Sequence, residues 1–205
     1  MGQAKIRREA LRQQMLDKSK EWDFPPSPWE VAVCVELKEE DVVVIQRAPA
    51  NHLAWARMPA NKCHANASWY AKNDRSGKAK AVVGWWVQWP NFVLHSVVEI
   101  DGALICMTPS QYNEAGIPFI PDPKISWIED GEVYSAVRNG QVVGPGVRMF
   151  PAFTMAQNAI VRERLLAGVD PLKAGDFTDE EMAELERQYI EGPSKGANSA
   201  AMPLY

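Results

Sequence analysis

Two kinds of side chain that together can break an acyl bond stand in short motifs in the first half of the chain. Cys63 and His64 occur in NKCHANASWY, and His95 follows in FVLHSVVEIDG. A thiolate is a strong nucleophile, and a nearby imidazole can take the thiol proton and later protonate a leaving group. Cys63 and His95 are therefore the candidate nucleophile and general base.

The position of Cys63 supports this assignment. We predict a helix over residues 63–73, with Asn61 as its N-cap and several alanines in its interior. The unpaired N–H groups at a helix N-terminus stabilise a thiolate and can receive an oxyanion. His64 lies about 100° further round such a helix, so we expect it to face solvent or the rim of a substrate site.

Three strands are predicted after this helix, over residues 80–89, 92–100 and 103–109. The dipeptide Asp101-Gly102 is a strong signal for a tight hairpin between the second and the third. His95 would then be held rigidly on the middle strand. A polar group on the neighbouring strand could orient its ring.

The motifs KCHANASWY, VVGWW and LHSVVEIDGALICMTPS together resemble the core of the papain-like and transglutaminase-like thiol superfamily, over residues 61–110. They are particularly similar to small bacterial and phage proteins in which a Cys-x-x-Asn helix precedes a GW strand and a His-x-x-V strand. The resemblance implies a helix packed on an antiparallel sheet. It also implies that Cys63 is the nucleophile and His95 the base, with Asn66 one turn below the thiol and Thr108 and Pro109 at the end of the pattern.

One residue departs from the family pattern. Cys106 stands where the resemblance predicts an acid or amide that orients the imidazole. Glu99, Asp101 or Thr108 could replace it, the site could work as a dyad, or it could be degenerate. The resulting candidate set places catalysis at Cys63, His95 and Thr108, and a substrate or oxyanion region at Asn61, His64, Asn66 and Trp86.

Other interpretations of the same residues remain open at this point. Cys63 and His95 could be buried core residues. Cys63, His64, His95 and Cys106 could bind zinc, but they lack the paired spacing of structural zinc sites, and we expect neither a metal nor another cofactor. The tryptophan-rich strand GWWVQW could line a groove, but it lacks the interleaved basic residues of a nucleic-acid platform.

The rest of the chain predicts an α+β fold with helices added at both ends. EVAVCVEL (residues 30–37) and VVVIQR (residues 42–47) read as a hairpin, with Cys34 in the core. A second hairpin turns at Asn139-Gly140, and two helices cover residues 153–167 and 178–190, the latter opened by a Thr178–Glu181 capping box. The predicted parts are a basic N-terminal helix and linker (1–24), an α+β core (25–150), a helical annex (151–192) and a flexible tail (193–205).

The composition of the chain limits the classes of function to be considered. The net charge of −4 over 205 residues argues against a general nucleic-acid binder. Three cysteines without a CxxC pair, and the lack of a secretory or membrane-spanning apolar run, favour a cytoplasmic protein. The leading hypothesis is a cysteine-dependent hydrolase or acyltransferase acting on an amide, isopeptide or thioester. The alternative is a non-catalytic interaction protein, encoded by a phage or mobile element, that binds a host protein. Both imply a protein or peptide partner, and the oligomeric state stays open.

Overall fold

The structure, a computed structural model, describes residues 2–110, 116–130 and 133–191. The chain divides into two compact units, one formed by residues 28–149 and the other by residues 1–27 and 150–205. Within the described residues, no helix combines the length and the apolar character needed to cross a membrane. The tail over residues 193–205, which we predict to be flexible, lies outside the described part of the chain.

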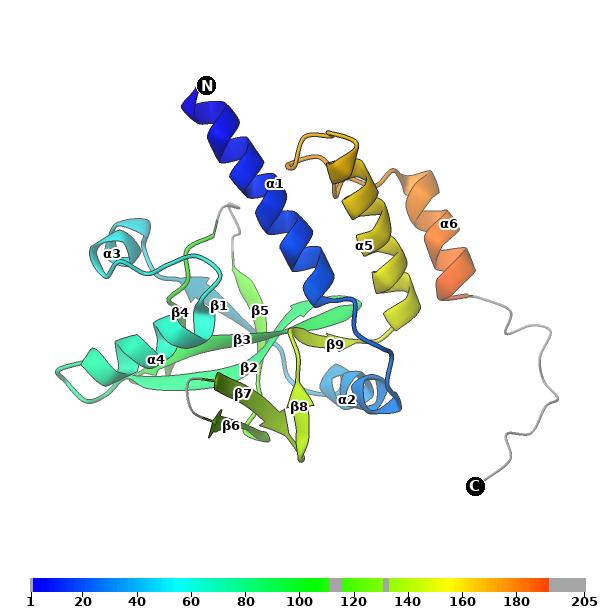
Figure 1. Cartoon of the computed structure of the whole chain (residues 1–205). Coiled ribbons are helices and arrows are strands. Elements are labelled where there is room, and N and C mark those ends of the chain that lie inside the picture. Colours follow the sequence, from blue (N-terminus) through cyan, green and yellow to red (C-terminus); the bar gives the residue numbers. More distant parts are fainter. Residues whose placement is uncertain (1, 111–115, 131–132, 192–205) are drawn as a thin grey trace, which may run out of the picture. The chain divides into compact units, whose positions relative to one another are not determined.

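The unit over residues 28–149 is built on a closed β-barrel (Figure 1). Its five strands follow the order β2-β5-β1-β4-β3, and pairing of β3 with β2 closes the ring. A sixth strand, β9, extends the sheet from β3. The strands are β1 (Val43–Arg47), β2 (Lys80–Gln88), β3 (Asn91–Ile100), β4 (Ala103–Cys106), β5 (Ile117–Pro121) and β9 (Gly146–Arg148). All neighbours are antiparallel except β1 and β4.

The predicted α+β class is confirmed, and the predicted succession of the strands now named β2, β3 and β4 is also confirmed. The predicted hairpin before them is wrong. Its first half is a helix, and its second half, β1, pairs with β4 and β5, which follow it much later in the chain. The sheet therefore closes on itself rather than remaining the simple antiparallel sheet that we expected.

The barrel interior receives alternate side chains from all five strands. These residues are Ile45, Val82, Trp86, Val97, Leu104, Cys106, Ile117 and Phe119. His95 belongs to the same side of β3 as Val97, because the two are separated by two positions along the strand. Gly84 faces His95 across the ladder, and a Cβ there would lie 2.1 Å from the carbonyl oxygen of Ile120 on β5. Only glycine lets β5 pass this close to β2.

Helices and a small sheet cover the outside of the barrel. Helix α4 (Cys63–Asn73) packs on β2 and β3, with Ala67 against Val98 and Met107 in one apolar cluster that also includes residues next to α3 (Ala50–Trp55). Helix α2 (Pro28–Lys38) and the sheet of β6 (Ile125–Asp130), β7 (Val133–Arg138) and β8 (Gln141–Val143) share a second cluster around Trp85.

Helix α2 corrects the strand predicted over residues 30–37. Its buried positions are Glu30, Val33, Cys34 and Leu37, which recur with helical period, whereas Val35 between them is 55% exposed. The β-branched valines made the segment look like a strand. Tertiary contacts outweigh that propensity, because Glu30 forms a fully buried ion pair with Arg148 on β9. Cys34 is a core residue as predicted, although in a helix.

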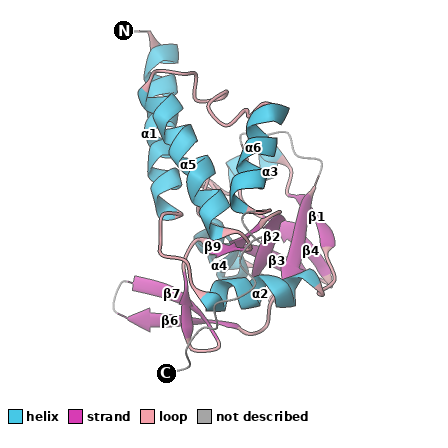
Figure 2. Ribbon diagram, turned by 90° about the vertical axis from the view of Figure 1, so that its right-hand side faces the viewer, coloured by secondary structure: helices cyan, strands magenta, loops and turns pink. Residues whose placement is uncertain are grey.

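The second unit contains three helices, α1 (Gln3–Glu21), α5 (Pro151–Leu166) and α6 (Asp179–Tyr189). Figures 1 and 2 show α1 beside α5, and α6 on the other side of α5. An ion pair joins Arg162 to Asp23 at 2.6 Å. The predicted helices are confirmed, and the predicted capping box at Thr178 and Glu181 is present.

Candidate functional site

Cys63 is the first residue of α4, as predicted, and its sulfur points at the backbone of β3. The thiol is half-buried and accepts from the backbone N–H groups of Ser96 and His64. Burial, the largest cause, raises the pKa of Cys63, these N–H groups lower it, and the Coulomb interaction with Cys106 raises it; the net pKa is raised. Cys63 is therefore a neutral thiol at neutral pH rather than a resting thiolate.

The prediction that Asn61 caps this helix is wrong. The N-cap position is Lys62, which makes no side-chain capping hydrogen bond, and Asn61 lies in the left-handed turn before it with φ of 59°. The absence of a capping side chain leaves the first N–H groups of α4 turned toward the Cys63 sulfur, because no oxygen from the cap competes for them.

Strand β3 presents the N–H group that meets this sulfur. On one edge β3 pairs with β9 over residues 91–93 and with β4 over residues 98–100. The N–H of Leu94 still bonds to the carbonyl oxygen of Pro145 beside β9. The N–H of Ser96 points to the same edge, since backbone N–H groups two residues apart in a strand share a direction. The start of α4 fills the gap between β4 and β9 at this point.

His95 lies inside the barrel and is only 5% exposed. Its ring packs between Trp86 and Phe119, with ring centroids 5.8 and 6.3 Å away. Burial lowers the pKa of His95 to about 4, and the positive charges of His64 and Arg47 act in the same direction. The imidazole is consequently neutral at pH 7 and keeps one nitrogen lone pair as a base.

The partner of the His95 ring is the sulfur of Cys106. Nε2 lies 3.3 Å from Sγ, and Cys106 is fully buried at the end of β4. Among the described residues, no hydrogen bond reaches Nδ1 of His95 and none joins His95 directly to Cys63. The thiol lies instead against Ser96, the next residue along β3.

The other residues that could have oriented the His95 ring make no hydrogen bond to it across the described range 2–110. Asp101 occupies the hairpin turn and forms an ion pair with Lys78 at 3.0 Å. The hydroxyl of Thr108 accepts from Asn66 Nδ2 at 3.3 Å. Within the described part of the chain, no hydrogen bond connects Glu99 with His95. Cys106 is thus the group that meets the imidazole from the neighbouring strand.

Asn66 and Thr108 hold the site together. Asn66 is 2% exposed, and its amide also donates to the carbonyl oxygen of Pro59 at 2.9 Å. Because it joins α4 both to the preceding loop and to the residues after β4, it fixes where the helix begins relative to the barrel. The two residues are buried and contact each other, and Asn66 lies one helical turn after Cys63 on α4.

Arg47 is a site residue that the sequence interpretation missed. It lies at the end of β1, and Nη1 donates to Cys106 Sγ at 3.5 Å and to the carbonyl oxygen of Thr108. Its register partner across the parallel ladder is Cys106. The signal was present in the sequence, because Arg47 follows the inward-facing Ile45 by two positions and so belongs to the same face.

The expectation that His64 faces solvent or a substrate rim is wrong. The residue is half-buried, Nδ1 lies 2.7 Å from Oγ of Ser96, and its ring packs edge-on against Trp127 at 4.8 Å. Burial lowers the pKa of His64 to about 4. His64 therefore holds the first turn of α4 against β3. Trp127, which packs against the His64 ring, is 41% exposed.

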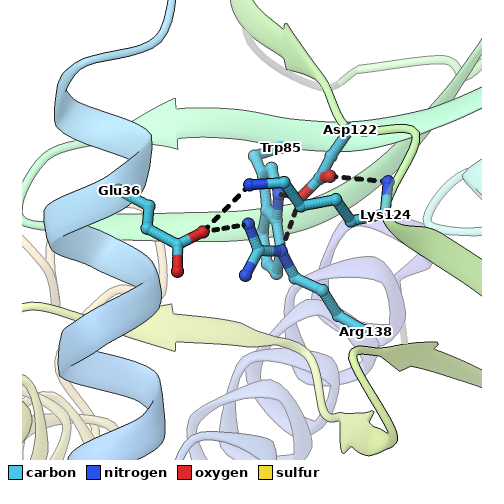
Figure 3. A network of polar contacts seen from close by, with 5 residues as sticks. All are labelled: Glu36, Trp85, Asp122, Lys124 and Arg138. Carbon is cyan, nitrogen blue, oxygen red and sulfur yellow. Dashed lines mark hydrogen bonds and ion pairs between the residues drawn. The ribbon is translucent and has the colours of Figure 1, made fainter.

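A buried polar network fixes the small sheet that carries Trp127 (Figure 3). Asp122, between β5 and β6, accepts from Nε1 of Trp85 at 2.7 Å and from Nε of Arg138 at 2.8 Å. Arg138 also donates to Glu36 on α2 at 2.8 Å. The network joins α2, the barrel strand β2 and the small sheet through one buried guanidinium.

The two buried histidines predict a pH-dependent stability. Their pKa values are about 4 in the folded chain, against an ordinary value of 6.5. Between these values the unfolded chain binds a proton at each ring and the folded chain does not. The free energy of unfolding is thus expected to fall as pH drops from 6.5 toward 4, by on the order of 1.4 kcal/mol per pH unit for each histidine. Above pH 6.5 the two histidines contribute their full amount to the free energy of unfolding.

Urea unfolding at several pH values measures this effect. His95→Gln and His64→Gln should each flatten the dependence between pH 6.5 and 4, and His52→Gln is the matched control, since His52 lies on α3 outside the cluster. Equal slopes for wild type and His95→Gln would contradict the burial of a neutral imidazole.

No protein-family model matches this chain, and no curated protein or solved structure matches it. Among the described residues, no group of three or more His, Cys, Asp or Glu side chains is arranged to hold a metal ion.

Proposed function

We propose that this chain is a cysteine-dependent hydrolase or acyltransferase, built on a papain-like and transglutaminase-like core, that acts on an amide, isopeptide or thioester bond. The observation that carries the proposal is the arrangement around His95. Nε2 is occupied by Cys106 from the neighbouring strand, which leaves Nδ1 as the ring nitrogen without a hydrogen bond among the described residues. The Cys63 sulfur accepts a hydrogen bond from the backbone N–H of Ser96, the residue next to His95 on the same strand.

The reaction begins from neutral partners. Nδ1 of His95 takes the proton of Cys63 as the sulfur forms a bond to the substrate carbonyl carbon, and the carbonyl electron pair moves to its oxygen. The N–H groups at the start of α4 receive this oxyanion. His95 then gives its proton to the leaving amine or thiol as the bond to that group breaks. Water, or an acceptor amine, attacks the thioester in the second half, with His95 again as base.

The pKa values favour this base-assisted route over a preformed ion pair. The pKa of Cys63 is raised mainly by burial and that of His95 is lowered mainly by burial. Proton transfer must therefore accompany attack on the substrate, as in hydroxyl nucleophiles with a histidine base. Simple alkylation by iodoacetamide, which reacts with free thiolate, is a poor probe for such a site, and an acyl donor is the appropriate one.

Acylation by p-nitrophenyl acetate tests the proposal. We expect a rapid release of one nitrophenolate per chain, with the acetyl group on Cys63 when the peptides are mapped by mass spectrometry. Cys63→Ala should abolish the burst. Cys34→Ala is the matched control, because Cys34 is fully buried outside the cluster and burial raises its pKa to about 12. A burst that survives in Cys63→Ala, or an acetyl group found elsewhere, would reject the nucleophile assignment.

A second candidate function, protein binding without chemistry, is favoured by exposed tryptophans on helices α3 and α4. Trp55 at the end of α3 is 78% exposed and Trp69 on α4 is 49% exposed. Exposed aromatic side chains of this size are typical of binding surfaces. If wild-type protein shows no acylation of Cys63, this second function becomes the better explanation of the same fold.

A further inference from the structure

The sulfur of Cys106 occupies an unusual electrostatic position. Two nitrogen atoms lie close to it, Nε2 of His95 at 3.3 Å and Nη1 of Arg47 at 3.5 Å. As a thiol, Cys106 would donate to the carbonyl oxygen of Thr108 over a longer distance, 3.8 Å, and that oxygen already accepts from Arg47. A sulfur that lies closer to a guanidinium and an imidazole than to the carbonyl oxygen of Thr108 is placed to accept hydrogen bonds from these two groups.

Burial strengthens the interaction between Arg47 and this sulfur. Cys106 is fully buried and the Arg47 head group lies against it at the barrel end. In such surroundings a positive charge interacts far more strongly with a nearby anion than it would in water. A guanidinium carries a positive charge, so Arg47 favours negative charge on its neighbour. The Coulomb interaction with Cys106 is also one of the causes that raise the pKa of Cys63, so the two sulfurs are electrostatically coupled.

We propose that Cys106 is a thiolate held by Arg47 that serves as the third member of the site, in the position where a carboxylate or amide would orient the histidine. As an acceptor, the sulfur keeps the ring proton on Nε2 of His95 and so leaves the lone pair on Nδ1. When His95 takes the Cys63 proton, the negative sulfur stabilises the imidazolium. Cys106 is thus a positioning residue, and Arg47 acts through it. This inference rests on the proposed function.

The thiolate can be observed without any reaction. In Cys63→Ala, ultraviolet thiolate absorption is expected at pH 7, since the sulfur of Cys34 is protonated there with a pKa of about 12. The signal should disappear in Cys63→Ala/Cys106→Ala and in Cys63→Ala/Arg47→Met, where a side chain of similar length lacks the charge. A thiolate signal that is absent at pH 7 in Cys63→Ala overturns the proposal, because Cys106 would then be a thiol donating to Nε2.

The kinetic test uses acylation of Cys63 by p-nitrophenyl acetate in the full chain. Cys106→Ala should slow acylation at least 10-fold, and Cys106→Asp should recover most of the rate, because a carboxylate can both accept from Nε2 and pair with Arg47. Cys34→Ala, which removes the same atom from another fully buried position, should leave the rate unchanged. A merely structural role predicts that aspartate, a buried charge with a different shape, is worse than alanine.

The outcomes separate this inference from the proposed function. If wild type is acylated at Cys63 and Cys106→Ala is acylated equally fast, Cys106 has no positioning role and the enzyme proposal stands. If wild type is not acylated, the proposed function fails, whereas the spectroscopic measurement on Cys63→Ala still decides whether Cys106 is charged. The Arg47→Met measurement keeps the test decisive should Cys106→Ala fold poorly.

Discussion

Replacing His95 with glutamine is expected to lower the rate of Cys63 acylation by about 10²–10⁴-fold, the usual contribution of a general base. Glutamine has a side chain of similar reach but cannot take a proton at neutral pH. The effect should be large because the raised pKa of Cys63 leaves almost no thiolate to react unaided. The measurement is the rate of the nitrophenolate burst with p-nitrophenyl acetate in excess over the protein.

The pH dependence of that rate distinguishes base catalysis from simple thiolate chemistry. In wild type the rate should be flat from about pH 7 to 9, because burial lowers the pKa of His95 and the ring is already neutral over this range. In His95→Gln the rate should rise about tenfold per pH unit, following the thiolate fraction of Cys63. His64→Gln is the control histidine, since its Nδ1 is engaged by Ser96. Parallel pH profiles for wild type and His95→Gln would remove His95 from the mechanism.

Replacing Asp122 with alanine is expected to reduce the free energy of unfolding by about 3–5 kcal/mol. The change leaves the buried guanidinium of Arg138 without its buried carboxylate and the indole N–H of Trp85 without its acceptor. Arg138 is 1% exposed and Trp85 is fully buried, so water cannot replace the lost partner without opening the core. Urea unfolding followed by far-ultraviolet circular dichroism measures the loss.

Glu36 provides the matched control for this prediction. It binds the same guanidinium at 2.8 Å, but its side chain is 46% exposed, so Glu36→Ala should cost no more than about 1 kcal/mol. The double variant Asp122→Ala/Arg138→Met should recover part of the loss, because it removes the unpaired buried charge. If Asp122→Ala costs no more than Glu36→Ala, burial is not what gives the network in Figure 3 its stability.

Local sequence signals predicted the elements whose geometry depends on a few neighbouring residues. The helix over residues 63–73 agrees with α4, and the dipeptides Asp101-Gly102 and Asn139-Gly140 adopt the left-handed turns expected of tight hairpins. Gly77 and Gly168 likewise have positive φ after their helices. These predictions hold because backbone conformation at a turn or cap is decided within four residues of the chain.

The elements that were predicted wrongly or missed depend on contacts between residues that lie far apart in the sequence. The segment of residues 30–37 is a helix because Glu30 meets Arg148, which lies more than a hundred positions later, and local β propensity could not reveal that partner. The closure of the barrel depends on β5, a strand that the sequence interpretation did not identify, and on the parallel pairing of β1 with β4.

For the candidate site, the sequence by itself determined which residue types were available and in which order: a thiol at the start of a helix, an imidazole on the second following strand and a cysteine on the next. Only the tertiary structure decided their environment. It placed His95 inside a closed barrel, where burial keeps the ring neutral, and set Cys106 against Nε2 with Arg47 beside it. The physical reason is that protonation and hydrogen bonding depend on what surrounds a group in space, and strands far apart in the chain supply those surroundings.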